Sequence, residues 1–202
     1  MNAAVKYQLN TLFQSATINL NPLALLGASQ CAAEKDIRFY LNGVYVDVKS
    51  STAFIVGCDG HMIGVFKQYA GDVPDFGVII PLEVIKKIDK KSDTVELTYE
   101  EDKDRWSLSG IRFVPVDGRY PDWRKVADTN VDETPHKTQI NPELTARAVK
   151  AFKVFYGSKV IPDTLSCQNG LAVIMHVGDN NSMVKIMGIR ADHHPKYIAM
   201  KL

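Results

Sequence analysis

The stretch that decides the fold is residues 36–64, DIRFYLNGVYVDVKSSTAFIVGCDGHMIG. Apolar and polar residues alternate through it, and Val44, Val46 and Val48 share one face. A period of two in a β-branched run indicates a half-buried strand. Asn42-Gly43 supplies the positive-φ positions of a tight hairpin. The stretch therefore predicts strands joined by turns; the strands are expected at 39–41, 44–49 and 53–57, and the turns at 42–43, 50–51 and 59–60.

The same order of elements recurs three times. Asn21-Pro22 and Asn141-Pro142 each place an N-capping asparagine before a proline at the first helical position, and Pro81 opens a shorter helix. Each predicted helix follows a short strand and precedes three more, so the chain contains three strand–helix–three-strand units. The expected helices are 22–34, 81–90 and 142–155. Besides the strands already given, one or two strands are expected within residues 5–20, and another is expected to end near Lys67. The remaining expected strands are 78–80, 95–99, 105–108, 111–116, 138–140, 165–168, 171–177, 183–188 and 197–200.

The repeats predict how the chain divides. Residues 1–127 hold two units with both helices and strands, which indicates an α+β fold. Residues 128–137 are polar and are expected to form a linker. Residues 138–202 hold one unit.

Composition excludes several classes of protein. The 202 residues carry a net charge of only +1, which argues against a large basic surface gripping nucleic acid. No apolar run approaches the roughly 18 residues that span a membrane, and the N-terminus lacks a signal-peptide pattern. Cys31, Cys58 and Cys167 are odd in number and far apart, which suits a reducing cytoplasm and gives no disulfide or zinc pattern.

Three segments together resemble the bacterial DNA polymerase III beta sliding clamp family. The first comprises RFYLNG and the turn Cys58-Asp59-Gly60-His61-Met62, where the family has threonine and arginine in place of Cys58 and Met62. The second is FVPVDGRYPDWR at 113–124, and the third is the terminal YIAMKL at 197–202. The family's first domain and half of its third have no counterpart in the chain. This reduced form suggests a phage or mobile-element version of the family.

The resemblance implies an α+β DNA-clamp fold, with antiparallel sheets outside and helices on the inner face. Two units make one domain in that family, so residues 1–127 would form a complete domain and residues 138–202 half of another. It also implies a non-catalytic replication accessory protein without metal or cofactor. Such a processivity factor encircles or contacts duplex DNA without reading its sequence, and tethers a polymerase or another clamp-binding peptide in an apolar groove. It is expected in the cytoplasm of a bacterium or a phage-infected host, as a homo-oligomer. Four copies would give the twelve units of a family ring, whereas a monomer, a dimer or an open arc is equally consistent with the sequence. The groove residues implied are Leu41, Cys58, Gly60, His61, Met62, Ile63, Val126, Met200, Lys201 and Leu202. The expected DNA-facing residues are Lys35, Lys86, Lys87, Lys90, Lys91, Arg147, Lys150, Lys153 and Lys159.

Other interpretations stay open. The alternative function is a non-encircling adaptor or decoy, which binds clamp-binding peptides without holding DNA. Any one lysine could equally belong to a solvated helix face, and Leu41 and Ile63 could be core residues. Asp59-Gly60-His61 lacks the third partner of a catalytic triad, and His193-His194 lacks distant metal ligands. An enzyme or a metal site is therefore disfavoured.

Overall fold

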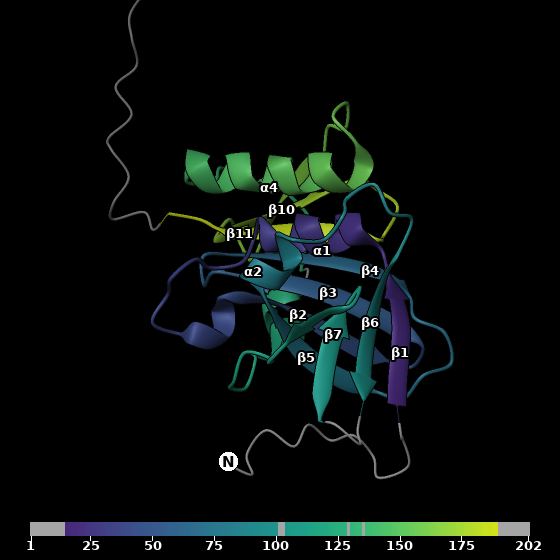
Figure 1. Ribbon diagram of the computed structural model, residues 1–202. Helices are drawn as coiled ribbons and strands as arrows, with labels where there is room; N and C mark the ends of the chain where they lie inside the picture. Colours follow the sequence, from purple (N-terminus) through teal and green to yellow (C-terminus); the bar gives the residue numbers. More distant parts are fainter. Residues whose placement is uncertain (1–14, 101–103, 129, 135, 190–202) are drawn as a thin grey trace, which may run out of the picture.

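The computed structural model describes residues 15–100, 104–128, 130–134 and 136–189. Two antiparallel sheets organise them (Figure 1). The smaller sheet has the order β1-β6-β7-β8, formed by Ser15–Leu20, Val95–Glu100, Arg105–Leu108 and Ile111–Phe113. The larger sheet has the order β5-β2-β3-β4-β11-β10-β9, formed by Phe76–Pro81, Gly43–Lys49, Thr52–Cys58, Met62–Tyr69, Ser182–Met187, Ala172–His176 and Asp163–Cys167. The expected α+β class and clamp-type layering are confirmed.

The first two units exchange their first strands. We call β1 to β4 with helix α1 (Pro22–Ser29) the first unit, and β5 to β8 with the short helix α2 (Leu82–Ile85) the second unit. β1 pairs with β6 of the second unit, with Leu20 opposite Val95. β5 pairs with β2 of the first unit, with Pro81 opposite Gly43. The two units are therefore related by an approximate two-fold exchange of strands.

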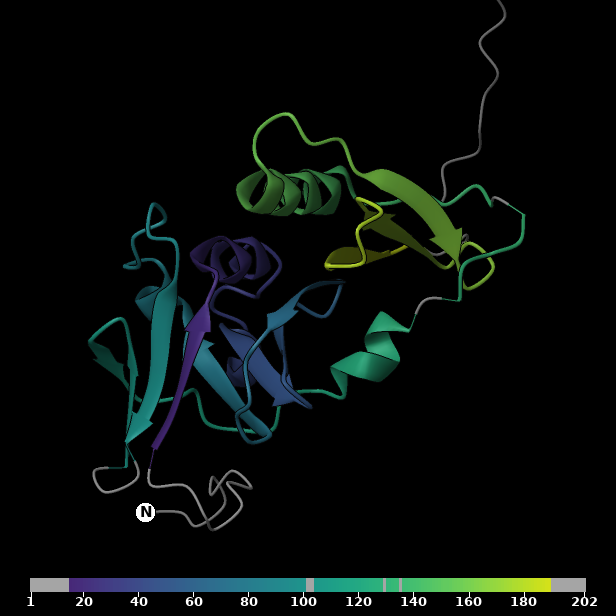
Figure 2. The same ribbon diagram turned by 90° about the vertical axis from the view of Figure 1, so that its right-hand side faces the viewer.

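The third unit consists of helix α4 (Pro142–Tyr156) and strands β9 to β11. It joins the first unit edge to edge, because β11 pairs antiparallel with β4 from Ser182–Phe66 to Ile186–Met62. On the same face of this sheet α4 packs beside α1, as Figure 2 shows. The result is one continuous seven-stranded sheet with α1 and α4 lying side by side on it.

The core lies between these helices and the sheet. Val44, Val46 and Val48 are buried there together, as their alternation predicts. Phe152 of α4 and Phe66 of β4 are fully buried in the same cluster. Helix α1 approaches so closely that a Cβ at Gly57 would lie 1.9 Å from the carbonyl oxygen of Ala28. Glycine at this strand position is therefore required by the helix–sheet contact.

A second apolar cluster lies on the opposite face of the sheet. Tyr120 stacks on Tyr45 with ring centroids 4.7 Å apart, and Trp123 packs against Phe54 at 5.1 Å. Trp123 begins a short helix, α3 (Trp123–Ala127), which the sequence prediction missed. The indole Nε1 of Trp123 donates to Asp47 at 2.8 Å. These contacts hold residues 120–127 against the face of the sheet that α1 and α4 do not cover.

Several predicted elements are wrong or displaced. Residues 39–41 form a 3-10 turn rather than a strand, because the Leu41 amide donates back to the Arg38 carbonyl. The helix predicted over 22–34 ends at Ser29, and the amide of Ala33 instead donates to the carbonyls of Leu41 and Cys58. The helix predicted over 81–90 is only α2, since the backbone tightens into turns after Ile85.

The region around the third unit also differs from expectation. Residues 138–140 are not a strand in the structure. Within the predicted linker, Val131 forms an antiparallel bridge with Cys167, so this part of 128–137 lies along β9. The strand predicted at 197–200 and the N-terminal part of the 5–20 region lie outside the described residues. The domain boundaries at 127 and 137 stay a prediction.

Candidate functional site

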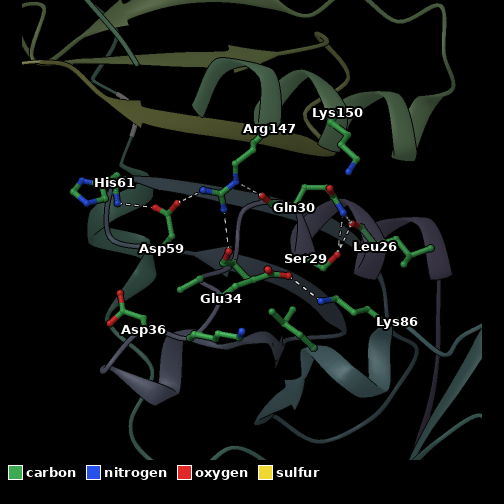
Figure 3. Close-up of a pocket in the computed structure, with 14 residues that line it drawn as sticks. Leu26, Ser29, Gln30, Glu34, Asp36, Asp59, His61, Lys86, Arg147 and Lys150 are labelled. Atoms are coloured by element: carbon green, nitrogen blue, oxygen red, sulfur yellow. Dashed lines mark hydrogen bonds and ion pairs between the residues drawn. The ribbon is translucent and has the colours of Figure 1, made fainter. Parts of the chain in front are cut away.

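The third unit meets the first at a pocket of about 680 Å³ (Figure 3). Its wall is formed by the end of α1, the residues that follow α1, the β3–β4 turn, α2 and α4. Charged groups of both signs line it, and they come from the residues after α1, the β3–β4 turn, the residue after α2, and α4. The charged and titratable residues among them are Glu34, Lys35, Asp36, Asp59, His61, Lys86, Arg147 and Lys150.

Arg147 bridges the two units within this pocket. It projects from α4, and its Nε and Nη2 atoms donate to the carbonyl oxygens of Gln30 and Ala32, each at 2.9 Å. Its Nη1 atom donates to Oδ2 of Asp59 at 2.5 Å. The first two bonds satisfy backbone acceptors beyond the end of α1. Arg147 was predicted to face DNA; in the structure these three bonds hold its guanidinium at the joint between units, and contact with phosphate stays a prediction.

Asp59 also orders the turn that contains His61. Its Oδ1 atom accepts from the backbone amides of His61 and Met62, both at 2.8 Å. This arrangement is an Asx-type turn, which explains an aspartate at this position. The His61 carbonyl then accepts from the amide of Met187, the last residue of β11. Through Asp59, the conformation of this turn is tied to the position of α4.

The other cationic residues predicted to face DNA stay exposed. Lys35 follows α1, and the cluster at Lys86, Lys87, Lys90 and Lys91 follows α2. Lys150, Lys153 and Lys159 lie on or after α4. Lys86 forms an exposed ion pair with Glu34 at 2.9 Å, which lowers the pKa of that carboxyl through its hydrogen bond. Acidic residues therefore interleave with the lysines, and the basic surface is discontinuous.

The neighbouring segment is also held by an ion pair. Arg38 donates to both carboxylate oxygens of Asp36, at 3.0 and 2.7 Å. These hydrogen bonds lower the pKa of Asp36 to about 2. Arg38 also donates to the Asp59 carbonyl at 3.1 Å. The 3-10 turn and the β3–β4 turn are thereby fixed to one another.

The residues expected to form the peptide groove fall into two groups. Leu41, Cys58, Met62 and Ile63 are at most 7% exposed, so their side chains belong to the core in this state. Gly60, His61 and Val126 are exposed, and Val126 is on α3. The remaining three, Met200, Lys201 and Leu202, lie outside the described residues. The groove stays a prediction.

The cluster beneath α3 gives the groove prediction a structural setting. Leu41, Cys58 and Ile63 pack with Tyr120 and Trp123 in it, and Met183 of β11 is partly buried against the same cluster. Lys185, also on β11, is 6% exposed, and its Nζ donates to the Asp128 carbonyl at 2.8 Å. The exposed Val126 therefore sits on a rigid support. Neither this support nor the Asp59–Arg147 pair was found from sequence, because each depends on residues distant along the chain.

The thiols offer no reactive nucleophile among the described residues. Cys31, Cys58 and Cys167 are free and buried. Burial raises the pKa of Cys31 to about 12 and raises the pKa values of Cys58 and Cys167. A search of the described residues finds no group of histidine, cysteine and acidic side chains suited to a metal ion. In the same residues, no helix is long and apolar enough to cross a membrane.

Comparison with known proteins gives one consistent result, although no protein-family model matches the chain. The beta sliding clamp of Vibrio cholerae is 31% identical over 109 residues, which cover 50% of this chain and 30% of that protein. By structure, the DNA polymerase III beta subunit of Thermotoga maritima matches 94% of this chain and 70% of its own, with a TM-score of 0.68 at 12% identity.

A Helicobacter pylori beta clamp bound to a DNA ligase peptide matches 88% of this chain and 66% of its own, with a TM-score of 0.64 at 12% identity. The structural likenesses show the fold alone. In sequence, the chain spans about a third of the length of the Vibrio cholerae relative.

Proposed function

We propose that this chain, which is similar to the bacterial beta sliding clamp over about half of its length, is a non-catalytic, clamp-type replication accessory protein. It contacts duplex DNA through the face that carries α1, α2 and α4, without reading base sequence. It holds clamp-binding peptides, such as a polymerase tail, on the opposite face near α3. In this proposal the protein tethers an enzyme to DNA and has no chemistry of its own.

The observation that carries the proposal is the division of the two faces. α1 and α4 lie side by side on one face of the large sheet, and Lys150 and Lys153, three residues apart on α4, are exposed there. The other face carries the apolar cluster beneath Tyr120 and Trp123. Exposed lysines suit the phosphate backbone, which supplies sequence-independent affinity. An apolar surface on rigid elements suits leucine or phenylalanine anchors of a short peptide.

Peptide binding is tested by fluorescence polarisation with a labelled peptide that carries leucine and phenylalanine anchors. Val126→Asp places a charge at the proposed groove and is expected to weaken binding at least about tenfold. Val114→Asp is the matched control, because Val114 is also an exposed valine, at 84%. Equal affinity of the two variants and the unaltered protein would contradict a groove at Val126.

DNA contact is tested by the salt dependence of binding to two duplexes of unrelated sequence. We expect equal affinity for both duplexes and a steep loss of affinity as salt rises. Lys150→Glu with Lys153→Glu should weaken binding at least about tenfold, since both lysines contribute to the phosphate-facing charge. Lys49→Glu, on β2, is the control, because Lys49 is exposed but lies outside the helices. Undiminished binding by the double variant would contradict the assigned DNA face.

The adaptor or decoy function is the second candidate, favoured by the mixed charge of the helix-bearing face. Glu34 neutralises Lys86, and Arg147 is held by Asp59 and two carbonyls. Peptide binding with no measurable duplex binding at low salt would support this function. Salt-dependent duplex binding together with peptide binding would support the clamp function.

A further inference from the structure

In the part of the chain that the structure describes, nothing covers the third unit as the second unit covers the first. In the first unit, β2 is flanked by β5, and α1 has α2 beside it. In the third unit, β9 takes the position of β2, and α4 takes the position of α1. Among the described residues, β9 ends the large sheet, and only its far end is paired, through Asn130–Asp132 with Ser166–Gln168. The third unit therefore exposes a surface whose counterpart on the first unit is covered by the second unit.

That uncovered surface is open and partly apolar. Asp163, Thr164 and Leu165 of β9 are exposed. Ile161, just before β9, is 86% exposed. Beside it a pocket of about 400 Å³ reaches between the flank of α4 and the sheet, lined by Val149, Lys153, Ser158, Lys159, Val160, Ile161, Pro162 and Met175.

The segment that precedes α4 lies in the same position relative to its helix as β1 does relative to α1. Asn19 lies three residues before Pro22, and its carbonyl accepts from the Gln68 side chain near the end of β4. Gln139 lies three residues before Pro142, and its carbonyl accepts from the amide of Ile189, just after β11. β1 continues from this point to pair with the second unit. Residues 138–140 are at the equivalent point, yet they form no strand within a single chain.

We infer that two copies of this chain associate through their third units, each giving residues 138–140 to the open edge of β9 in the other copy. Within one chain, the first two units exchange β1 and β5 about an approximate two-fold axis. Between two copies, residues 138–140 of each chain would be exchanged about an exact two-fold axis. Ile140 would lie opposite Asp163 of the second copy, as Leu20 lies opposite Val95 and Pro81 opposite Gly43. The α4 flanks then face one another and cover the pocket beside Val149.

The charges on α4 agree with this pairing. In this pairing the two-fold axis runs perpendicular to α4, so the two helices are antiparallel. Glu143 lies in the first turn of α4, and Lys153 lies in the last turn. Each carboxylate is therefore placed toward the basic end of the other helix, where Lys159 follows. A second copy would therefore pair with the open edge of β9, cover the pocket beside Val149 and bring opposite charges of the two α4 helices together.

Light scattering on a sizing column tests the association. We expect a mass of about 45 kDa or a multiple of it at micromolar concentration, where one chain is 22.5 kDa. Ile161→Asp should raise the dissociation constant at least about tenfold, because it buries a charge at the contact. Ile37→Asp is the control, since Ile37 is 95% exposed and lies in the first unit. A single chain at all concentrations would overturn the inference.

Cross-linking tests the strand exchange itself. Gln139→Cys and Thr164→Cys are made in separate chains and mixed under mild oxidation. Residues directly opposite in an antiparallel pair are close enough for a disulfide. We expect a covalent dimer of about 45 kDa, twice the 22.5 kDa chain, from the mixture and much less from either variant alone. The native cysteines are buried and do not compete. A dimer that resists both Ile161→Asp and this cross-link would place the interface elsewhere and overturn the inference.

The inference is independent of the proposed function in its readout. Mass and cross-linking require neither DNA nor peptide. If the Ile161→Asp variant is a single chain in solution and still binds the labelled peptide, association and peptide binding are separate properties, and the peptide-binding proposal stands.

Discussion

Arg147 and Asp59, 88 positions apart, form an ion pair that ties the third unit to the β3–β4 turn of the first. Asp59 is 9% exposed, and the Arg147 side chain is 36% exposed. The same aspartate holds the amides of His61 and Met62. The joint between units and the turn expected to border a peptide groove therefore share one carboxylate.

Removing this arginine should loosen the third unit. Arg147→Ala leaves the Asp59 carboxylate and two carbonyls without their donors, so we expect the free energy of unfolding to fall by about 1–3 kcal/mol. Urea unfolding measures the loss, and hydrogen exchange should show faster exchange in α4. Lys150→Ala, one turn along the same helix, should change stability by less than about 0.5 kcal/mol. Equal stability of both variants would show that the pair does not hold the joint.

The contact of α1 with the sheet predicts unequal costs for two glycine substitutions. Gly57→Ala places a Cβ 1.9 Å from a backbone oxygen, so the helix must move; we expect a loss of about 3 kcal/mol. Gly27→Ala places a Cβ 3.0 Å from the ring of Phe66, which can shift. Alanine also favours the helix by up to about 1 kcal/mol, which offsets part of that cost. Thermal unfolding of the two variants should show Gly57→Ala as the less stable.

Trp123 should anchor the outer segment through both packing and its hydrogen bond. Trp123→Ala removes the contact with Phe54 and the bond to Asp47, and we expect a loss of about 3 kcal/mol. Trp123→Phe retains most of the packing and removes the donor, so it should cost about 1 kcal/mol. Chemical unfolding of both variants separates the two contributions. A larger loss for phenylalanine than for alanine would contradict this division.

Alkaline pH should destabilise the protein through Cys31. Burial raises the pKa of this thiol from 9.0 to about 12. The unfolded thiol ionises first, so the stability that Cys31 contributes is fully present below pH 9 and is lost as pH rises toward 12. The loss is on the order of 3–4 kcal/mol across that window.

The measurement is the pH dependence of urea unfolding for the protein and for Cys31→Ala. The variant should lose less stability between pH 8 and pH 11, whatever its stability at neutral pH. Identical pH profiles would show that the thiol does not titrate as its burial requires. In parallel, a thiol reagent at pH 8 should modify none of the three buried cysteines before unfolding.

The sequence determined the local elements with strong patterns. Val44, Val46 and Val48 alternate because one face of β2 is buried, and Asn21-Pro22 and Asn141-Pro142 begin helices because asparagine caps the free amides. The order of the units and the DNA-clamp fold could also be predicted, since three segments in the right order resemble the family.

The tertiary structure alone decided which residues meet. The side-chain pattern of β4 and β11 does not encode their pairing, and nothing near Arg147 in sequence indicates Asp59 as its partner. The early end of α1 is set by backbone bonds from Ala33 to Leu41 and Cys58, which no local propensity contains. Burial likewise separates Leu41 and Ile63 in the core from exposed Val126. Periodicity reports what one element does along its own axis, whereas these features arise from packing between distant elements.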